Sequence, residues 1–309
     1  MKPRDILAAV LQCPATALVG LAAILFTGWH WAGHDVMRWT LDARAFHGEP
    51  WRLVTSAFPH AGIFHLGFNL YWLWVFGSRI EIAWGSIRTT ALMAVLAAGS
   101  NMAEYAVLDG GIGLSGVGYG LFGLVWVLEK RDSRFHGAID RRTTEVFVGW
   151  FFLCIVLTAA KVMGVANFAH AAGWALGVLI GYAATAESRT RRALFWLAVV
   201  SSLLLTTLGS TFGRRFVNFS PDIGLDLAII GTEALQDDDF PRAVEFLEQA
   251  VAANGHVSGW WRNLGIAYEK LVRFSKAADA FERAYELDPS AADMRQAAAY
   301  CRARAGGRE

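Results

Sequence analysis

The residues best suited to chemistry in this chain are a serine, histidines and an asparagine placed at the edges of long apolar runs. Ser115 lies in a glycine-rich stretch, residues 110–120, where backbone can approach closely and N–H groups near a helix start point outward. That setting suits a nucleophile with an oxyanion hole. Small residues at a spacing of four are also common helix-packing contacts, so the stretch alone leaves both interpretations open.

A histidine in a second apolar run has the spacing of a partner for this serine. Glycines follow His170 every four residues and line one helix face, and a similar stripe follows Ser115. Docking the two stripes would bring His170 within hydrogen-bond reach of Ser115 as a general base, whereas a lone membrane histidine is often a packing or proton-relay residue. The two stripes are Gly173, Gly177 and Gly181, and Gly116, Gly120 and Gly123.

Two more histidines and an asparagine follow the pattern H-x4-H-x3-N in an earlier run. His60, His65 and Asn69 are assigned to the first turns of that run, with His65 and Asn69 on one helix face. The Asn69 amide could hold a developing oxyanion beside the backbone N–H of Ser115, worth about 3–4 kcal/mol. Interhelical hydrogen bonding or a His/Asn metal site are the alternatives, but no Asp, Glu or Cys accompanies these residues at ligand spacing, so no metal is predicted.

The elements that must position these residues are membrane helices. The 309 residues are 55% hydrophobic and 18% charged, with a mean hydropathy of +0.35, which excludes disorder, collagen and a nucleic-acid-binding surface. Three widely spaced cysteines offer neither a disulfide framework nor a metal site. Seven runs have the length that crosses a bilayer: about 14–32, 61–80, 88–108, 113–129, 146–165, 168–186 and 193–213.

The basic residues in the loops predict how these spans are oriented. With the N-terminus inside, inner segments hold twelve Lys and Arg, Lys2 among them, and outer segments hold six. Spans two, four and six then all run inward, so their first turns, with the Ser, His and Asn side chains, share one depth. The seventh span places the C-terminal region outside; if that run lies on the membrane surface, the region stays inside.

The last ninety residues have a different character, with 15 acidic against 10 basic side chains over 221–309. Helical amphipathic patterning repeats there with a period of 34, the tetratricopeptide period, and a third helix at about 291–304 caps the stack. The predicted function of such a unit is protein or peptide binding. The repeat positions are Trp261, Leu264, Gly265, Tyr268, Ala277, Phe281, Ala284 and Pro289, with Gly231, Ala243 and Ala250 in the first copy.

Taken together, the motifs resemble those of rhomboid intramembrane serine proteases, and the tail resembles a tetratricopeptide repeat domain. The resemblance covers residues 14–186. It rests on Gly113-Leu114-Ser115-Gly116, the triplet His60, His65 and Asn69, Ala169-His170-x-x-Gly173, and Trp51-Arg52 in the first outer loop.

The resemblance implies a Ser115-His170 dyad, with His65 and Asn69 joining Ser115 at the oxyanion and Gly113 and Leu114 belonging to that site. It also implies that Tyr119 packs on His170, that Trp51-Arg52 belong to a loop lying partly in the outer leaflet, and that Glu81 has a structural role. No Asp or Glu is evidently placed to orient His170.

The sequence therefore predicts an all-α chain: a short segment 1–13, a six-helix rhomboid core at 14–186, a seventh transmembrane helix and linker at 187–220, and a repeat domain at 221–309. The predicted enzyme is a serine endopeptidase that needs no cofactor and cuts transmembrane-helix substrates near the outer face of a bacterial plasma membrane. A non-catalytic scaffold that binds transmembrane helices is the alternative. A transporter is disfavoured because no internal symmetry is found. The sequence identifies neither the substrate nor the ligand of the repeats.

Overall fold

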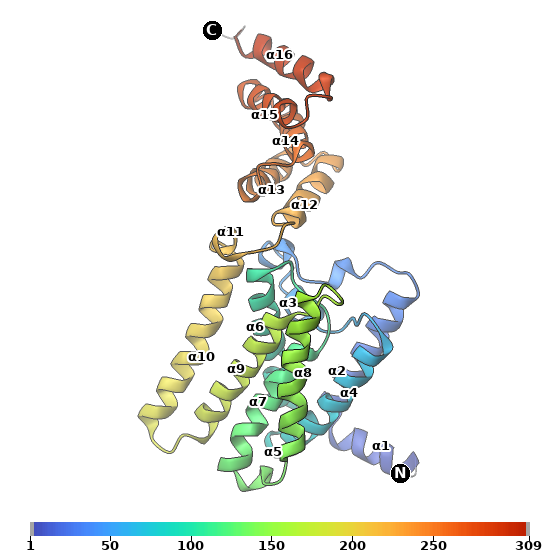
Figure 1. Cartoon of the computed structure of the whole chain (residues 1–309), viewed down its shortest axis with the longest axis vertical. Coiled ribbons are helices and arrows are strands. Elements are labelled where there is room, and N and C mark those ends of the chain that lie inside the picture. The colour runs from blue at the N-terminus through green and yellow to red at the C-terminus, as the bar shows by residue number, and fades with distance from the viewer. Residues whose placement is uncertain (1–2, 307–309) are drawn as a thin grey trace. The chain divides into compact units, whose positions relative to one another are not determined.

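The computed structural model describes residues 3–306, and this part of the chain is helical without strands. It divides into two compact units, Met1–Asn218 and Phe219–Glu309, which are coloured from blue to yellow and from orange to red in Figure 1. Lys2, which entered the orientation argument, and residues 307–309 of the predicted repeat domain lie outside the described residues.

In the first unit, a helix lies in each of the seven predicted apolar runs. A short helix, α1 (Pro3–Gln12), precedes them, and α11 (Arg214–Val217) follows them. The helices in the runs are α2 (Pro14–Trp31), α4 (Ile63–Trp72) with α5 (Ser78–Trp84), α6 (Ser86–Val107), α7 (Ser115–Arg131), α8 (Arg141–Ala159), α9 (Asn167–Thr185) and α10 (Arg189–Ser210).

The second predicted run differs from a single regular helix. A wider π-helical segment, Leu73–Gly77, separates α4 from α5, and such segments are rare in helices. Because α4 begins at Ile63, placing His60 in its first turn was wrong: His60 lies in the non-helical segment that precedes the helix.

Within residues 3–306, three helices are long and apolar enough to cross a membrane by length and composition: α8, α9 and α10. Only 11% of the apolar windows of α8 and α10 is buried, against 44% in α9. The apolar side chains that α8 and α10 expose are compatible with contact to lipid. The other predicted spans are helical but shorter, interrupted or more polar, and their crossing of a membrane stays a prediction.

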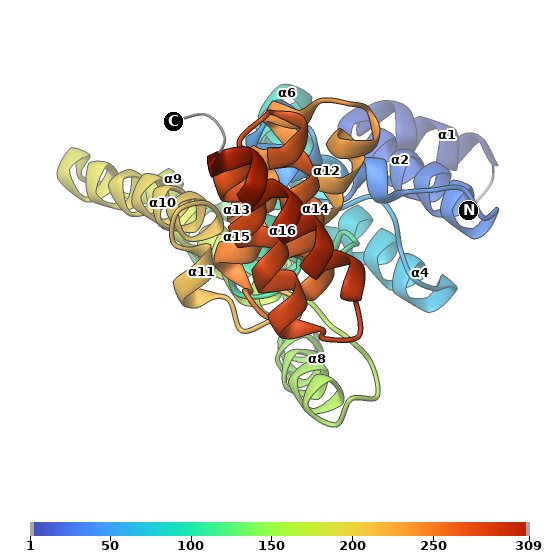
Figure 2. The ribbon, with the colours of Figure 1, turned by 90° about the horizontal axis from the view of Figure 1, so that it is seen from above.

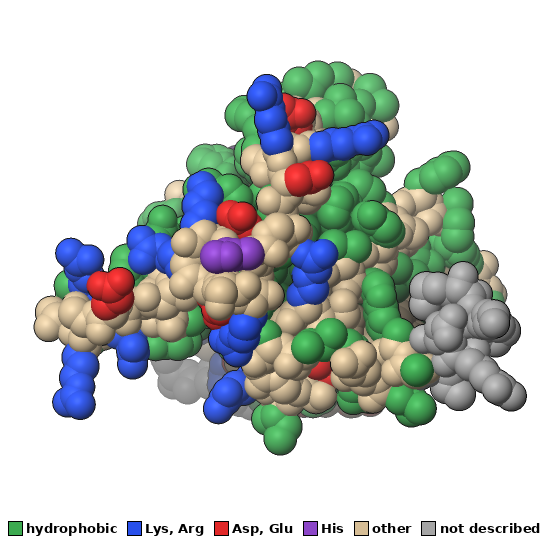
Figure 3. Space-filling view, turned by 90° about the horizontal axis from the view of Figure 1, so that it is seen from below, with side chains coloured by type: hydrophobic (Ala, Val, Ile, Leu, Met, Phe, Trp, Pro, Cys, Tyr) green, Lys and Arg blue, Asp and Glu red, His purple; other side chains and the backbone are tan. Residues whose placement is uncertain are grey.

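Charged side chains gather at one end of this unit. Figure 3 shows that end, with Lys and Arg side chains standing out around apolar surface. The last turn of α7 carries Lys130 and Arg131, and α10 opens with Arg189, Arg191 and Arg192. The predicted orientation places this end in the cytoplasm by the positive-inside rule, and it stays a prediction.

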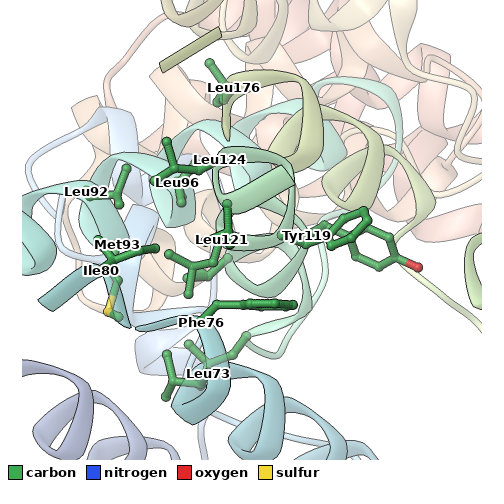
Figure 4. Close-up of a cluster of buried hydrophobic side chains, with 14 of the residues drawn as sticks. Leu73, Phe76, Ile80, Leu92, Met93, Leu96, Tyr119, Leu121, Leu124 and Leu176 are labelled. Carbon is green, nitrogen blue, oxygen red and sulfur yellow. The ribbon is translucent and has the colours of Figure 1, made fainter. Parts of the chain in front are cut away.

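The centre of the unit is the contact between α7 and α9, which the predicted glycine stripes make. A Cβ on Gly173 or Gly177 would overlap the backbone carbonyl of Gly116 or Gly120, respectively. Side chains of α6 and of Leu73–Gly77 pack around this pair in the buried cluster of Figure 4, which includes Phe76, Leu96 and Leu121. The predicted docking of the two stripes is confirmed.

The connection between α2 and α4 is ordered around one arginine. It contains two 3-10 turns, Met37–Trp39 and Ala43–Phe46, and the short helix α3 (Arg52–Thr55). Arg52 is buried and donates to the carbonyls of Met37 (2.6 Å) and Thr40 (2.9 Å) and to Glu49 (2.5 Å). Burial raises the pKa of Asp42, although Arg52 and Arg44 act in the opposite direction.

The second unit is a stack of helices in the predicted repeat pattern. Gly231 and Gly265, 34 residues apart, leave room for a side chain of the paired helix: a Cβ at either position would lie 2.7 Å from Leu247 or Phe281, respectively. The last helix, α16, packs its Met294, Ala298 and Cys301 into the same core. The helices are α12 (Leu225–Gln236), α13 (Phe240–Ala253), α14 (Ser258–Lys270), α15 (Phe274–Leu287) and α16 (Ala292–Gly306), drawn from above in Figure 2.

Candidate active site

The serine and the histidine meet at the start of their helices. Ser115 is the first residue of α7, and His170 lies in the first turn of α9. Ser115 Oγ lies 2.8 Å from His170 Nε2, a hydrogen-bond distance. Because the glycine stripes let the two helix backbones touch one residue beyond Ser115, these short side chains can reach each other.

The imidazole of His170 is held on one face by Tyr119, one turn beyond Ser115. The two rings are stacked with centroids 4.6 Å apart and an interplanar angle of 24°. The Tyr119 hydroxyl donates to the backbone carbonyl of Phe147 at 3.0 Å, and His170 is only 2% exposed. This packing fixes the plane of the imidazole beside the serine.

His60 binds the backbone just before Ser115. Its Nδ1 lies 2.8 Å from the carbonyl oxygen of Phe58, and its Nε2 lies 3.2 Å from the backbone nitrogen of Leu114. Since a carbonyl only accepts and a backbone N–H only donates, Nδ1 carries the proton and Nε2 accepts. Both ring nitrogens of His60 are thus engaged in holding the entry to α7.

His65 and Asn69 line the other side of this entry. The rings of His65 and His60 meet edge to face at 4.8 Å, and a Cβ on Gly113 would lie 2.7 Å from His65 Cε1. Gly113 also has a φ of +109°, so its lack of a side chain matters twice. The Asn69 amide donates to the His65 carbonyl at 3.0 Å.

The backbone donors before Ser115 are used within the protein. Gly113 N–H bonds the carbonyl of Ser56 at 3.2 Å, and Leu114 N–H bonds His60. Ser56 also donates its hydroxyl to the Gly111 carbonyl at 2.8 Å, which ties the glycine-rich stretch down. Ser115 itself, as the first residue of α7, has no intrahelical acceptor for its N–H.

Glu104 is a residue of the site region that the sequence reasoning missed. This buried side chain of α6 accepts the backbone N–H of Ala169 at 2.9 Å, immediately before His170. It touches the backbone of α9 and not the imidazole ring. An acid inside an apolar run was the available signal, because such groups are costly in lipid without a partner.

The remaining predicted residues lie around this centre. Gly116 faces Ser100, whose Oγ and Cβ leave no room for a side chain. Trp51 is 48% exposed beside the buried Arg52. Glu81 accepts hydrogen bonds from the backbone nitrogens of Ala15 and Thr16, both at 2.8 Å. It therefore binds the start of α2 and not the segment around Ser115.

Residues 3–306 contain no group of three or more His, Cys, Asp or Glu side chains placed to hold a metal ion. The cysteines Cys13, Cys154 and Cys301 are free and buried.

Within residues 3–306, all elements are helical, and a serine and a histidine lie in contact at the starts of two glycine-lined helices. Comparison with protein families finds a rhomboid domain at residues 47–187 and tetratricopeptide repeats at residues 231–302. The chain thus carries a rhomboid domain followed by a tetratricopeptide repeat region.

Curated relatives named rhomboid protease GlpG match about half of the chain. Those of two Klebsiella pneumoniae strains, 342 and ATCC 700721 / MGH 78578, are 30% identical over 161 residues, which is 50% of this chain and 55% of theirs. That of Enterobacter sp. strain 638 is 31% identical over 149 residues, 46% of this chain and 51% of the relative. The chain spans about half the length of the curated relatives it matches.

Proposed function

We propose that this protein is an intramembrane serine endopeptidase with Ser115 as nucleophile and His170 as general base. The observation that carries the proposal is the 2.8 Å contact between Ser115 Oγ and His170 Nε2, with the imidazole stacked on Tyr119. The rhomboid domain match and the named relatives support the same reaction class. The family resemblance alone would not separate an enzyme from a binder, whereas a paired nucleophile and base is needed only by the enzyme.

The chemistry proceeds in two halves. His170 Nε2 takes the Ser115 proton as Oγ attacks a peptide carbonyl, and the protonated imidazole then gives this proton to the leaving amine. The resulting acyl-enzyme is hydrolysed by water from the outer face. No step of this scheme needs a cofactor.

The oxyanion of each tetrahedral intermediate needs donors near Ser115. The proposed donors are the backbone N–H of Ser115, the Asn69 amide and the His65 ring. The bonds of Gly113 and Leu114 to Ser56 and His60 make their N–H groups unsuitable for this purpose in the resting enzyme. Their role is to set the path of the chain into α7.

The substrates we propose are single-span membrane proteins, cut near the outer end of the span. A fully hydrogen-bonded helix shields its carbonyls, so residues that weaken the helix favour cleavage. The repeat region would bind a protein or peptide. The N-terminus is proposed to lie in the cytoplasm and the repeat region on the outer side of a bacterial inner membrane.

The test is cleavage of a labelled single-span reporter by the purified, detergent-solubilised chain. Wild type should cleave the reporter and react with a fluorophosphonate probe, Ser115→Ala should lose both activities, and His170→Ala should lose cleavage. If well-folded wild type neither cleaves several reporters nor labels, the enzyme proposal fails. The non-catalytic scaffold that binds transmembrane helices then becomes the better interpretation.

A further inference from the structure

Two buried polar atoms in the first turn of α9 have no hydrogen-bond partner among the described residues: His170 Nδ1 and Asn167 Oδ1. They belong to residues three apart on one helix, which are neighbours on its surface. One is a ring nitrogen that can carry a proton, and the other is an oxygen that can only accept. Buried polar atoms without partners are uncommon, so two complementary ones on neighbouring residues of one helix face call for an explanation.

The orientation of the Asn167 amide follows from its other contacts. Its Nδ2 donates to the carbonyl of Val165 at 3.2 Å and to Thr158 Oγ1 at 3.0 Å. Since the carbonyl of Val165 can only accept, the amide nitrogen must face it. Thr158 is free to accept because its own hydroxyl proton goes to the carbonyl of Cys154 at 2.9 Å. Oδ1 is therefore the unused end of an anchored amide.

The proton on His170 follows from the proposed reaction. To accept the Ser115 proton, Nε2 must be unprotonated at rest, which places the single ring proton on Nδ1. That N–H then lacks an acceptor at the moment when the imidazole becomes positively charged. Hydrogen bonds of catalytic groups are often long in the resting state and tighten during the reaction.

We propose that Asn167 is a positioning residue for His170: its Oδ1 accepts the Nδ1–H as the imidazolium forms, after a small rotation of the two side chains. This inference rests on the proposed function. The contact keeps the proton on Nδ1, turns Nε2 toward Ser115 and stabilises the positive ring without adding a charged group. The arrangement is a Ser-His-Asn set assembled from two helix starts.

Three variants separate this role from a purely structural one. Asn167→Ala removes the acceptor, and kcat for the reporter should fall about 10–100-fold with KM little changed, the range seen when orienting partners are removed. Asn167→Asp keeps an acceptor oxygen but loses the donor to Val165 and Thr158, and it should retain most of the activity. Thr158→Val removes an anchor of Nδ2 while leaving Oδ1 in place, and it too should stay close to wild type.

The outcomes are distinguishable when thermal unfolding in detergent is measured alongside kinetics. If wild type does not cleave the reporter, or if Ser115→Ala still cleaves it, the proposed function and this inference are overturned together. With an active wild type, unchanged kcat in a folded Asn167→Ala overturns only the inference. Equal losses in Asn167→Asp and Thr158→Val would show that the amide merely holds α8 against α9, and would overturn it as well. If Asn167→Ala does not fold, the comparison of the other two variants decides.

Discussion

The contact of Gly173 with Gly116 offers the sharpest test of how the fold makes the site. A Cβ on residue 173 would overlap the Gly116 carbonyl oxygen and lie 3.0 Å from its carbonyl carbon. The obstacle is backbone, which cannot rotate away as a side chain could. Gly173→Ala should therefore push α9 away from α7 by roughly 1 Å, the shift that restores ordinary van der Waals separation.

The displacement occurs where the reaction takes place. Gly116 follows Ser115 directly, and Gly173 is three residues beyond His170, so the shift passes to the dyad almost undiminished. A 2.8 Å contact lengthened by roughly 1 Å exceeds hydrogen-bonding range. Loss of general-base catalysis then lowers kcat by about 10²–10⁴-fold, while overpacking destabilises the fold by about 1–3 kcal/mol.

The matched control is Gly149→Ala on α8, where a Cβ would meet nothing within 4 Å. This helical glycine is exposed, so alanine should leave cleavage unchanged and stabilise the helix by about 0.5–1 kcal/mol. Reporter cleavage and unfolding in mixed detergent and SDS micelles measure the two effects. Wild-type cleavage by Gly173→Ala would refute the argument that backbone contact between α7 and α9 sets the dyad distance.

Two other sites give predictions of stability. Glu81→Ala leaves the buried backbone nitrogens of Ala15 and Thr16 and the Thr16 hydroxyl without their acceptor, and should destabilise the first unit by about 3 kcal/mol in SDS unfolding; Glu81→Gln, which keeps one acceptor oxygen, should lose less. In the second unit, hydrogen bonds from Arg302 lower the pKa of Glu282. A lowered acid pKa gives stability that is present above the unfolded value of about 4.3 and lost as pH falls, so hydrogen exchange of α16, corrected for intrinsic rates, should speed up in acid. Arg302→Ala should flatten this pH dependence, and an unchanged profile would contradict the assignment.

The meeting of Ser115 and His170 could be predicted from sequence because two local patterns agree. Glycines at spacings of four, or of four and three, define one smooth face on each helix, and Ser115 and His170 each stand near the start of these stripes. Span lengths and alternating direction then put both starts at one depth. The docking needs no knowledge of other contacts, since only glycine faces allow backbones to approach so closely.

The non-helical position of His60 could not be predicted in the same way. The run around residues 61–80 is apolar throughout, and hydropathy does not show where its helical hydrogen bonds begin or where a π-helical segment interrupts them. The bond from Leu114 N–H to His60 joins residues 54 positions apart. Its existence depends on how the loop and α7 are rotated, which a single sequence does not report.

Two buried acids, Glu81 and Glu104, show a more general reason why the partners of such side chains could not be predicted. Neither α2 nor α9 has a side-chain cap of its own, because Cys13 and Ala166 occupy their N-cap positions. Local capping rules expect Ser, Thr, Asp or Asn at the N-cap position, and neither helix has one of these residues there. The orphan N–H groups are instead taken by carboxylates from other helices, Glu81 for α2 and Glu104 for α9.

An apolar environment makes such distant caps necessary. Where water is excluded, the free N–H groups at a helix start must find acceptors inside the protein. Glu81 and Glu104 are each 2% exposed. The free-energy cost of burying these carboxylates is offset by the hydrogen bonds that they accept from buried N–H groups. By contrast, Glu145 is exposed and pairs with Arg141 one turn away, a contact that contributes little. An acid within an apolar run is therefore evidence for a helix start elsewhere in the fold, and in this protein Glu104 marks the start of the helix that carries His170.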